Sequence, residues 1–204
     1  MGTIEREMAE ISCQDSEELK VFIRHLASQI KEKYHPQTVL DAGCAMGMLV
    51  AALRDLGVEA YGVDLSEYAS SRQVREDIRP YCAVGSLSSA LPDSLPKRYD
   101  LVVSMEVLEH MPEEDAKKAV ANLCAVTDRV LFSSVPDDTE DPTHINLRRA
   151  SLLVRLVCRT RTLFFCRRRK TGFFDKLCAV FSTKEHVGLG GTLREKAAKR
   201  RGAI

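Results

Sequence analysis

The sequence lacks the features that mark a membrane or secreted protein. No apolar run approaches the roughly eighteen residues that suggest a membrane-spanning helix. The amino terminus has no charged-then-apolar signal pattern. None of the seven cysteines forms a C-x-x-C pair or a Cys/His spacing of the zinc type. These absences predict a soluble, cytoplasmic protein with reduced thiols and no metal site.

Negative charge is scarce toward the carboxyl terminus. Residues 1–141 hold 14 Lys and Arg against 26 Asp and Glu, a formal charge of −12. Residues 142–204 hold 16 against 3, a formal charge of +13. The acidic body disfavours a nucleic-acid groove on the main domain, whereas the basic end suits an anionic surface or partner.

What the chain does contain is a strand, a turn of small residues and a helix. The pattern predicts a strand at 38–42 and a helix over 46–57. Gly43 and Gly47 allow a sharp turn and a close backbone approach to a ligand, and the helix start presents free N–H groups there. Asp64 closes the next strand, near the distance expected for a ribose-binding carboxylate. The sequence therefore predicts a nucleotide-binding elbow.

The glycine spacing separates two adenosine ligands. A dinucleotide fingerprint G-x-G-x-x-G begun at Gly43 needs glycine where Ala45 and Met48 stand, which disfavours an NAD-dependent enzyme. The pattern acidic-x-G-x-G-x-G is matched instead by Asp41, Gly43 and Gly47, with Ala45 replacing the middle glycine.

A family resemblance rests on this elbow, on Asp64 and on the segment 99–112, YDLVVSMEVLEHMP. Together they resemble the class I S-adenosylmethionine-dependent methyltransferases. The resemblance implies S-adenosylmethionine as methyl donor and S-adenosylhomocysteine as product, with Asp41 near the methionine portion and Asp64 on the ribose hydroxyls. The cofactor-binding residues expected on this basis are Asp41, Gly43, Cys44, Ala45, Gly47, Asp64, Leu65, Ser86, Leu87, Met105 and Glu106.

The remaining elements alternate between helix and strand. Helices are predicted from Ser16 to about His35 and over 67–78 and 113–126, and strands at 59–63, 81–84, 99–104 and 129–134. This alternation predicts an α/β fold, a doubly wound, mostly parallel Rossmann-like sheet with helices on both faces. The expected parts are a helical cap (1–36), a donor-binding core (37–147), an atypical basic part of the same domain (148–193) and a disordered tail (194–204).

The basic part departs from the family plan of a further helix and an antiparallel hairpin. Residues 142–174 contain nine Arg or Lys and no Asp or Glu. A helix near Leu152 and a strand at 163–165 are expected there. Three interpretations stay open: a degenerate hairpin core, a basic amphipathic helix for a membrane surface or partner, or an aberrant carboxyl end.

Two histidines are the candidate catalytic bases, His110 before Met111-Pro112 and His144 after the fifth predicted strand. Several candidate residues could instead have a purely structural role. His110 could satisfy backbone groups at a helix entrance, Glu106 could pair with a nearby Arg or N–H, and Asp64 could cap the helix after Ser66. Cys44 is read as a small spacer rather than a nucleophile. At the position of Ser86 the family commonly has an acidic residue that contacts the adenine amino group. Serine is shorter and uncharged, so the contact with adenine is expected to be weaker or to be made by the backbone.

Two features that the sequence lacks restrict the chemical class of the methyl acceptor. The loop after strand 99–104 lacks the Asn/Asp-Pro-Pro-aromatic motif of members that methylate adenine or glutamine nitrogen. The sequence also shows no set of carboxylates at the spacing expected for the magnesium-dependent, catechol-type members, so the enzyme is expected to need no metal. The favoured acceptor group is a hydroxyl or amine of a small-molecule, lipid- or saccharide-linked acceptor. The enzyme itself is expected to be a monomer or homodimer. A binding or regulatory protein that has lost turnover remains the alternative.

Overall fold

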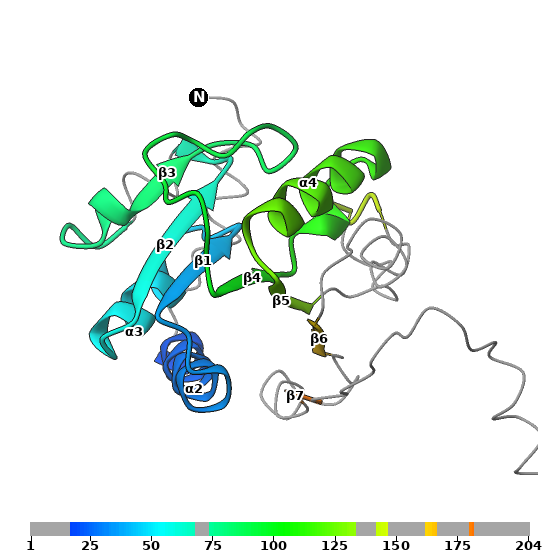
Figure 1. Cartoon of the computed structure of the whole chain (residues 1–204). Coiled ribbons are helices and arrows are strands. Elements are labelled where there is room, and N and C mark those ends of the chain that lie inside the picture. The colour runs from blue at the N-terminus through cyan, green and yellow to red at the C-terminus, as the bar shows by residue number, and fades with distance from the viewer. Residues whose placement is uncertain (1–16, 68–73, 134–141, 147–161, 167–179, 182–204) are drawn as a thin grey trace, which may run out of the picture.

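A largely parallel sheet forms the centre of this computed structural model, which describes residues 17–67, 74–133, 142–146, 162–166 and 180–181. Its strands lie in the order β3-β2-β1-β4-β5-β6-β7 (Figure 1). β6 and β7 are antiparallel, and the other neighbours are parallel. The bounds are β1 Thr38–Ala42, β2 Glu59–Asp64, β3 Cys82–Val84, β4 Leu101–Met105, β5 Arg129–Ser133, β6 Thr162–Cys166 and β7 Val180–Phe181.

Helices cover both faces of the sheet (Figure 1). α2 (Glu17–Tyr34) and α3 (Met48–Asp55) lie on one face, and α4 (Glu113–Val126) lies on the other. Successive strand residues point to opposite faces, so Leu40 packs in the α4 core while its neighbour Val39 packs in the α2 and α3 core. Short 3-10 helices, η2 (Arg79–Tyr81) and η3 (Leu108–His110), complete the described elements.

The predicted fold class is confirmed, because the sheet is Rossmann-like and wound in both directions from its centre. The helix predicted over 113–126 has the bounds of α4. The helix predicted over 46–57 is shorter, because Gly47 adopts a left-handed φ of 67° and caps α3. At the other end Gly57, with φ of 80°, lies beyond the helix.

The helix predicted over 67–78 is wrong in its described carboxyl part. Residues 74–78 form a bend and turns that lead into η2, and residues 68–73 lie outside the described part. The buried side chains of Val74 and Ile78 recur at helical spacing, which explains the prediction. The chain is instead held in a turn by Arg75, whose carbonyl accepts the N–H groups of Ile78 and Arg79.

The carboxyl-terminal predictions are tested only in part. The strand expected at 163–165 is confirmed as β6, which pairs with β5 and is followed by the antiparallel β7. The helix near Leu152 and the tail 194–204 lie outside the described residues. In the described part of the chain, no helix is long and apolar enough to cross a membrane.

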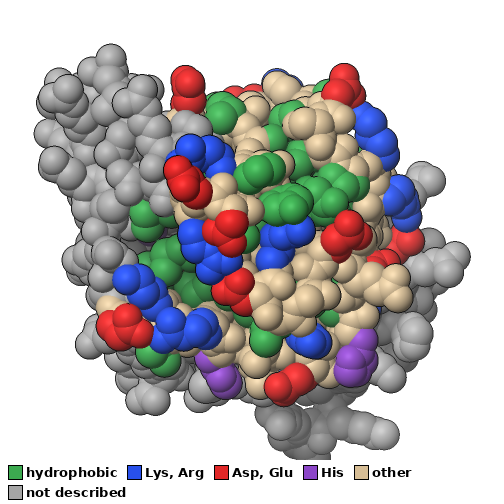
Figure 2. All heavy atoms as spheres, turned by 90° about the vertical axis from the view of Figure 1, so that its left-hand side faces the viewer, with side chains coloured by type: hydrophobic (Ala, Val, Ile, Leu, Met, Phe, Trp, Pro, Cys, Tyr) green, Lys and Arg blue, Asp and Glu red, His purple; other side chains and the backbone are tan. Residues whose placement is uncertain are grey.

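Acidic and basic side chains are mixed on the face of the molecule next to the edge strand β3, where they surround an apolar strip (Figure 2). On this side Arg75 bridges α3 and the turn before η2. Its guanidinium lies 2.8 Å from Asp55 and 2.7 Å from Asp77. The three side chains are about half exposed or more, so each ion pair is worth on the order of 0–1 kcal/mol.

Candidate functional site

The carboxyl ends of β1 and β4 meet where the strand order reverses. Open α/β sheets bind ligands in the crevice at this point. The two loops that leave these strands are in contact, because a Cβ on Gly43 would lie only 2.3 Å from Cγ2 of Val107. Glycine is therefore required at position 43, and the elbow after β1 shares one site with the loop after β4.

The elbow has a strained backbone. Gly43, Ala45 and Gly47 all have positive φ, of 90°, 43° and 67°. The turn is closed by the Gly47 N–H, which donates to the Cys44 carbonyl at 2.8 Å. Ala45 occupies the place of the middle glycine in the family pattern, and the left-handed region costs a non-glycine residue about 1–2 kcal/mol. Strain of this kind clusters at ligand sites.

Asp41 lies on β1 beneath the elbow, and its residue is only 6% exposed. Within the described part of the chain no group donates a hydrogen bond to its carboxylate. Burial, with a smaller contribution from the charge of Asp64, raises the pKa of Asp41 from 3.8 to about 7. A buried carboxylate without a donor is costly for the protein alone and suits a cationic or N–H-bearing ligand.

Asp64 ends β2 and is tied to the elbow. Its Oδ2 accepts the N–H of Ala45 at 2.8 Å, and its Oδ1 accepts the N–H of Ser66 at 2.8 Å. The second bond closes an Asx turn, while the helix that Asp64 was weighed as capping lies in residues outside the described part. Each carboxylate oxygen can accept a further hydrogen bond, which leaves capacity for ligand hydroxyls. The next residue, Leu65, is 75% exposed.

The loop after β3 uses its polar groups internally. The Ser86 hydroxyl lies 2.9 Å from that of Ser88 and accepts the Ser88 N–H at 3.3 Å. Leu87 is buried in the α4 core, so only its backbone is placed to reach a ligand. Asn122 on α4 donates its amide to the carbonyls of Leu87 and Ser89, at 2.9 and 2.7 Å. Nothing in the local sequence pointed to this role of Asn122.

The loop after β4 begins with a second strained residue. Glu106 has φ of 55°, and it follows the half-buried Met105. The Ser133 hydroxyl donates to Glu106 Oε1 at 2.6 Å, and the Glu106 N–H donates to the Ser133 carbonyl at 3.2 Å. Ser133 at the end of β5 therefore fixes the Glu106 carboxylate. This arrangement resembles the structural alternative considered for Glu106, a loop carboxylate with local hydrogen-bond partners.

The structure brings the two candidate histidines together. The rings of His110 on η3 and His144 lie edge to face, with centroids 4.8 Å apart. Thr143 adds a second contact, because its hydroxyl lies 3.1 Å from His110 Nδ1. Asn146, buried and absent from the sequence prediction, holds this segment in place. Its N–H donates to the Glu109 carbonyl at 2.9 Å.

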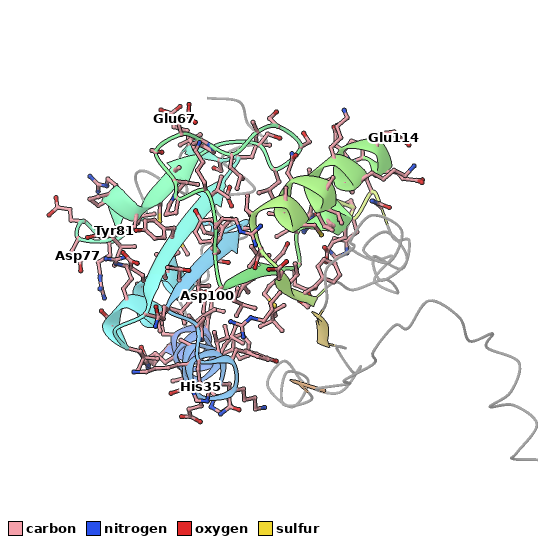
Figure 3. The ribbon with its side chains drawn as sticks, in the orientation of Figure 1. His35, Glu67, Asp77, Tyr81, Asp100 and Glu114 are labelled. Atoms are coloured by element: carbon pink, nitrogen blue, oxygen red, sulfur yellow. The ribbon has the colours of Figure 1, made fainter. Side chains whose placement is uncertain are left out.

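A depression of about 420 Å³ lies at the opposite, amino edge of the sheet. Lys31, His35 and Glu59 are among its lining residues, and Figure 3 labels His35 at this edge. None of its lining residues belongs to the predicted donor site. Among the described residues, no group of three or more His, Cys, Asp or Glu is arranged to hold a metal ion.

Similar proteins were found by sequence and by structure. The magnesium-protoporphyrin O-methyltransferase of Synechocystis sp. is 31% identical over 103 residues, which are 50% of this chain and 45% of that protein. The ubiquinone biosynthesis O-methyltransferase of Methylococcus capsulatus is 30% identical over 123 residues, 59% and 52% of the two chains. The chain thus spans about half the length of these relatives.

Two solved structures are similar to part of this chain. A protein from Pyrococcus horikoshii has 24% identity and a TM-score of 0.47, with 55% of this chain and 51% of that chain covered. The Synechocystis magnesium protoporphyrin IX methyltransferase, solved with bound SAH, has 23% identity and a TM-score of 0.43, with 53% and 52% covered.

The family assignment rests on a broader match. The model of the methyltransferase domain family matches residues 14–160, which is most of the chain and includes the elbow, Asp64 and both candidate histidines. The chain belongs to the methyltransferase domain family.

Proposed function

We propose that this chain transfers a methyl group from S-adenosylmethionine to an oxygen atom of a small-molecule acceptor. The observation that carries the proposal is the union of three features at the switch point of the sheet. The strained elbow, the buried Asp41 and the elbow-bound Asp64 converge at the carboxyl ends of β1 and β2. The names of the two curated relatives, both O-methyltransferases, support oxygen over nitrogen as the acceptor atom.

Asp41 provides the test of fit for the donor. The donor carries an ammonium group and a sulfonium, both positive. A carboxylate that is buried and has no donor among the described residues gains a partner when such a cation binds above it. The residues proposed to hold the methionine end are therefore Asp41 and the backbone from Gly43 to Gly47.

Asp64 is the proposed ribose ligand. Its carboxylate is half-exposed, and the hydrogen bond from Ala45 already orients it relative to the elbow. The adenine is proposed to lie toward the backbone of Ser86 and Leu87, because the Ser86 hydroxyl is engaged with Ser88. Met105 and Glu106 are proposed to close the crevice from the β4 side.

When bound, the sulfonium supplies an electrophilic methyl group for in-line displacement. The protein's main contribution is then to align and desolvate the two reactants, for which effective molarities of about 10⁵ M or more are available. His110 and His144 are proposed to receive the acceptor proton. General base catalysis adds about 10²- to 10⁴-fold to the rate. Thr143 and Asn146 hold the two rings in mutual contact.

The experiment combines binding with turnover. Thermal shifts are measured with S-adenosylmethionine, S-adenosylhomocysteine and NAD, because a ligand stabilises the fold by RT ln(1 + [L]/Kd). Methyl transfer from labelled donor is then followed across phenols, carboxylic acids and amines. We expect stabilisation by the two adenosyl compounds and transfer to an oxygen acceptor. Stabilisation by NAD alone would overturn the proposal.

A binding protein without turnover is the second candidate. It is favoured by Ala45, which is strained where the family pattern has glycine, and by the internal use of the Ser86 hydroxyl. Donor binding without methyl transfer to any acceptor of the panel would support this candidate over the enzyme.

A further inference from the structure

Two free thiols lie beside the proposed donor site, and the reaction uses neither. Cys44 is in the elbow and is 6% exposed, and Cys82 begins β3 and is half-buried. They are far apart in sequence, and both pack on the side of the sheet covered by α2 and α3.

The strand register explains how the thiols meet. Asp41, Gly62 and Cys82 are successive partners across β1, β2 and β3, so they form one row on the same face of the sheet. Gly62 leaves an empty position in the middle of this row. The Cys44 side chain fills it, since a Cβ on Gly62 would lie 2.6 Å from Cys44 Sγ. The Cys44 thiol is thereby placed over β2, next to Cys82.

The elbow also touches Cys82 directly. A Cβ on Gly47 would lie 3.1 Å from Cys82 Sγ. The two thiols therefore lie under opposite ends of the same short turn, with Asp41 beside them in the row. Any covalent link between them changes the shape of the turn.

The environments of the two sulfurs differ. The neighbouring Cys44 thiol lowers the pKa of Cys82, and the Arg54 guanidinium acts in the same direction, although burial and the nearby carboxylates oppose it. The neighbouring Cys82 thiol and burial raise the pKa of Cys44. A more acidic, more accessible thiol beside a buried one is the arrangement of a peroxide-sensing cysteine with its resolving partner.

We propose that Cys44 and Cys82 are a site of reversible oxidation, and that their disulfide closes the donor crevice. Cys82 releases its proton, its thiolate attacks a peroxide oxygen, the O–O bond breaks, and the sulfenic acid forms while the departing hydroxide takes up that proton as water. The Cys44 sulfur then attacks the Cys82 sulfur and loses its own proton, the S–O bond of the sulfenic acid breaks, and the hydroxyl leaves with that proton as water. One peroxide is reduced, and two thiols are oxidised to one disulfide.

The effect on binding follows from the short sulfur–sulfur bond of about 2.05 Å, well below any non-bonded contact. Cys44 must move toward β3 to form it. Its N–H now donates to the Val63 carbonyl at 3.2 Å, and the adjacent Ala45 N–H is held by Asp64. The movement breaks this arrangement. The consequence for donor binding rests on the proposed function, whereas the formation of the disulfide does not.

The test uses the full chain, reduced and then treated with hydrogen peroxide. Peptide mapping by mass spectrometry looks for a Cys44–Cys82 cross-link, and calorimetry measures S-adenosylmethionine affinity before oxidation, after it and after reduction by dithiothreitol. We expect the cross-link, a loss of affinity of at least tenfold and full recovery on reduction. Absence of the cross-link, or a cross-linked protein with unchanged affinity, would overturn the proposal.

Two variants separate this site from the other cysteines. Cys82→Ser is expected to bind the donor and to keep its affinity after peroxide, while Cys124→Ser on the opposite face is expected to respond like the wild type. A Cys82→Ser protein that loses affinity as the wild type does would refute the assignment. If the reduced wild type binds no donor, the proposed function fails, and the cross-link still decides the thiol pair.

Discussion

An aspartate lies in opposite environments at the two edges of the sheet, and its pKa shifts in opposite directions. At the amino edge, labelled in Figure 3, Asp100 Oδ2 accepts the N–H groups of Gln37 at 2.8 Å and Thr38 at 3.0 Å. Burial would raise the pKa of Asp100, but these hydrogen bonds and the nearby Arg129 together lower it. At the carboxyl edge Asp41 is more deeply buried and has no donor among the described residues, and its pKa rises to about 7.

Backbone strain follows the same division. His35, near the amino edge, has φ of 45°, but it ends α2 and its N–H caps the Lys31 carbonyl. A left-handed residue at a helix end is a common way to satisfy the last carbonyls. Ala45 and Glu106 have positive φ in the two loops of the carboxyl edge, where no helix ends. The comparison shows that the left-handed residue of the amino edge serves a helix end, whereas those of the carboxyl edge lie in the loops of the proposed donor site.

The largest expected effect is the opposite pH response of the two aspartates, beginning with Asp41. Its folded pKa is above the unfolded value of 3.8, so the free energy of unfolding falls as pH rises from about 4 to 7. The limit for a shift of this size is on the order of 4 kcal/mol. Asp41→Asn removes this slope and weakens donor binding. Urea unfolding of both proteins without donor, at pH 5 and pH 8, measures it, and equal slopes would contradict the assignment.

The next effect compares two glycines with left-handed φ. Gly43→Ala adds a Cβ 2.3 Å from Val107 Cγ2 at φ of 90°, so strain and overpacking together cost about 3 kcal/mol. Gly57→Ala is the control, because its φ is 80° but no atom lies within 4 Å of the added Cβ. It is expected to cost about 1 kcal/mol. Chemical denaturation distinguishes them, and similar losses would show that Val107 does not constrain the elbow.

A smaller effect is expected at the amino edge. Asp100→Asn replaces a carboxylate that accepts two backbone N–H groups, and exposure of the site limits the loss to about 1 kcal/mol. Because the pKa of Asp100 is lowered, its contribution is present above pH 4 and disappears as pH falls through the folded value. The unfolding free energies of the two proteins, measured from pH 7 downward, should approach each other as pH falls below 4. A difference that does not change with pH would exclude this ionic origin.

The smallest effect is a gain at Ala45. Ala45→Gly relieves a left-handed residue, worth about 1–2 kcal/mol, but increases the entropy of the unfolded chain by about 0.4–1 kcal/mol. The net expectation is a stabilisation of about 0.5 kcal/mol with donor affinity retained. A thermal melt measures it, with Ala51→Gly inside α3 as the destabilising control. A loss of stability at position 45 would show that its strain is not local.

The sequence predicted the parts of the fold that local chemistry decides. The elbow follows from its two glycines, and α4 follows from Pro112 and three acidic residues in the first turn. The helix predicted over 67–78 failed in its described part because the chain turns there, with the Arg75 carbonyl accepting the N–H groups of Ile78 and Arg79, and helical spacing does not reveal this turn.

The site was predictable only where its residues are neighbours in sequence. Asp41 and Asp64 follow from the strand ends, and the structure adds the hydrogen bond between Asp64 and Ala45. The contact of His110 with His144 joins residues on separate loops, and no periodicity encodes it. The same holds for Cys44 and Cys82, whose approach depends on the missing side chain of Gly62.

The most direct test of the proposed donor site is a calorimetric titration of S-adenosylmethionine into three proteins. These are the wild type, Asp64→Ala at the carboxyl edge and Asp100→Ala at the amino edge. We expect binding by the wild type, affinity at least tenfold weaker for Asp64→Ala, and affinity near the wild-type value for folded Asp100→Ala. Equal affinities of the wild type and Asp64→Ala would contradict the account.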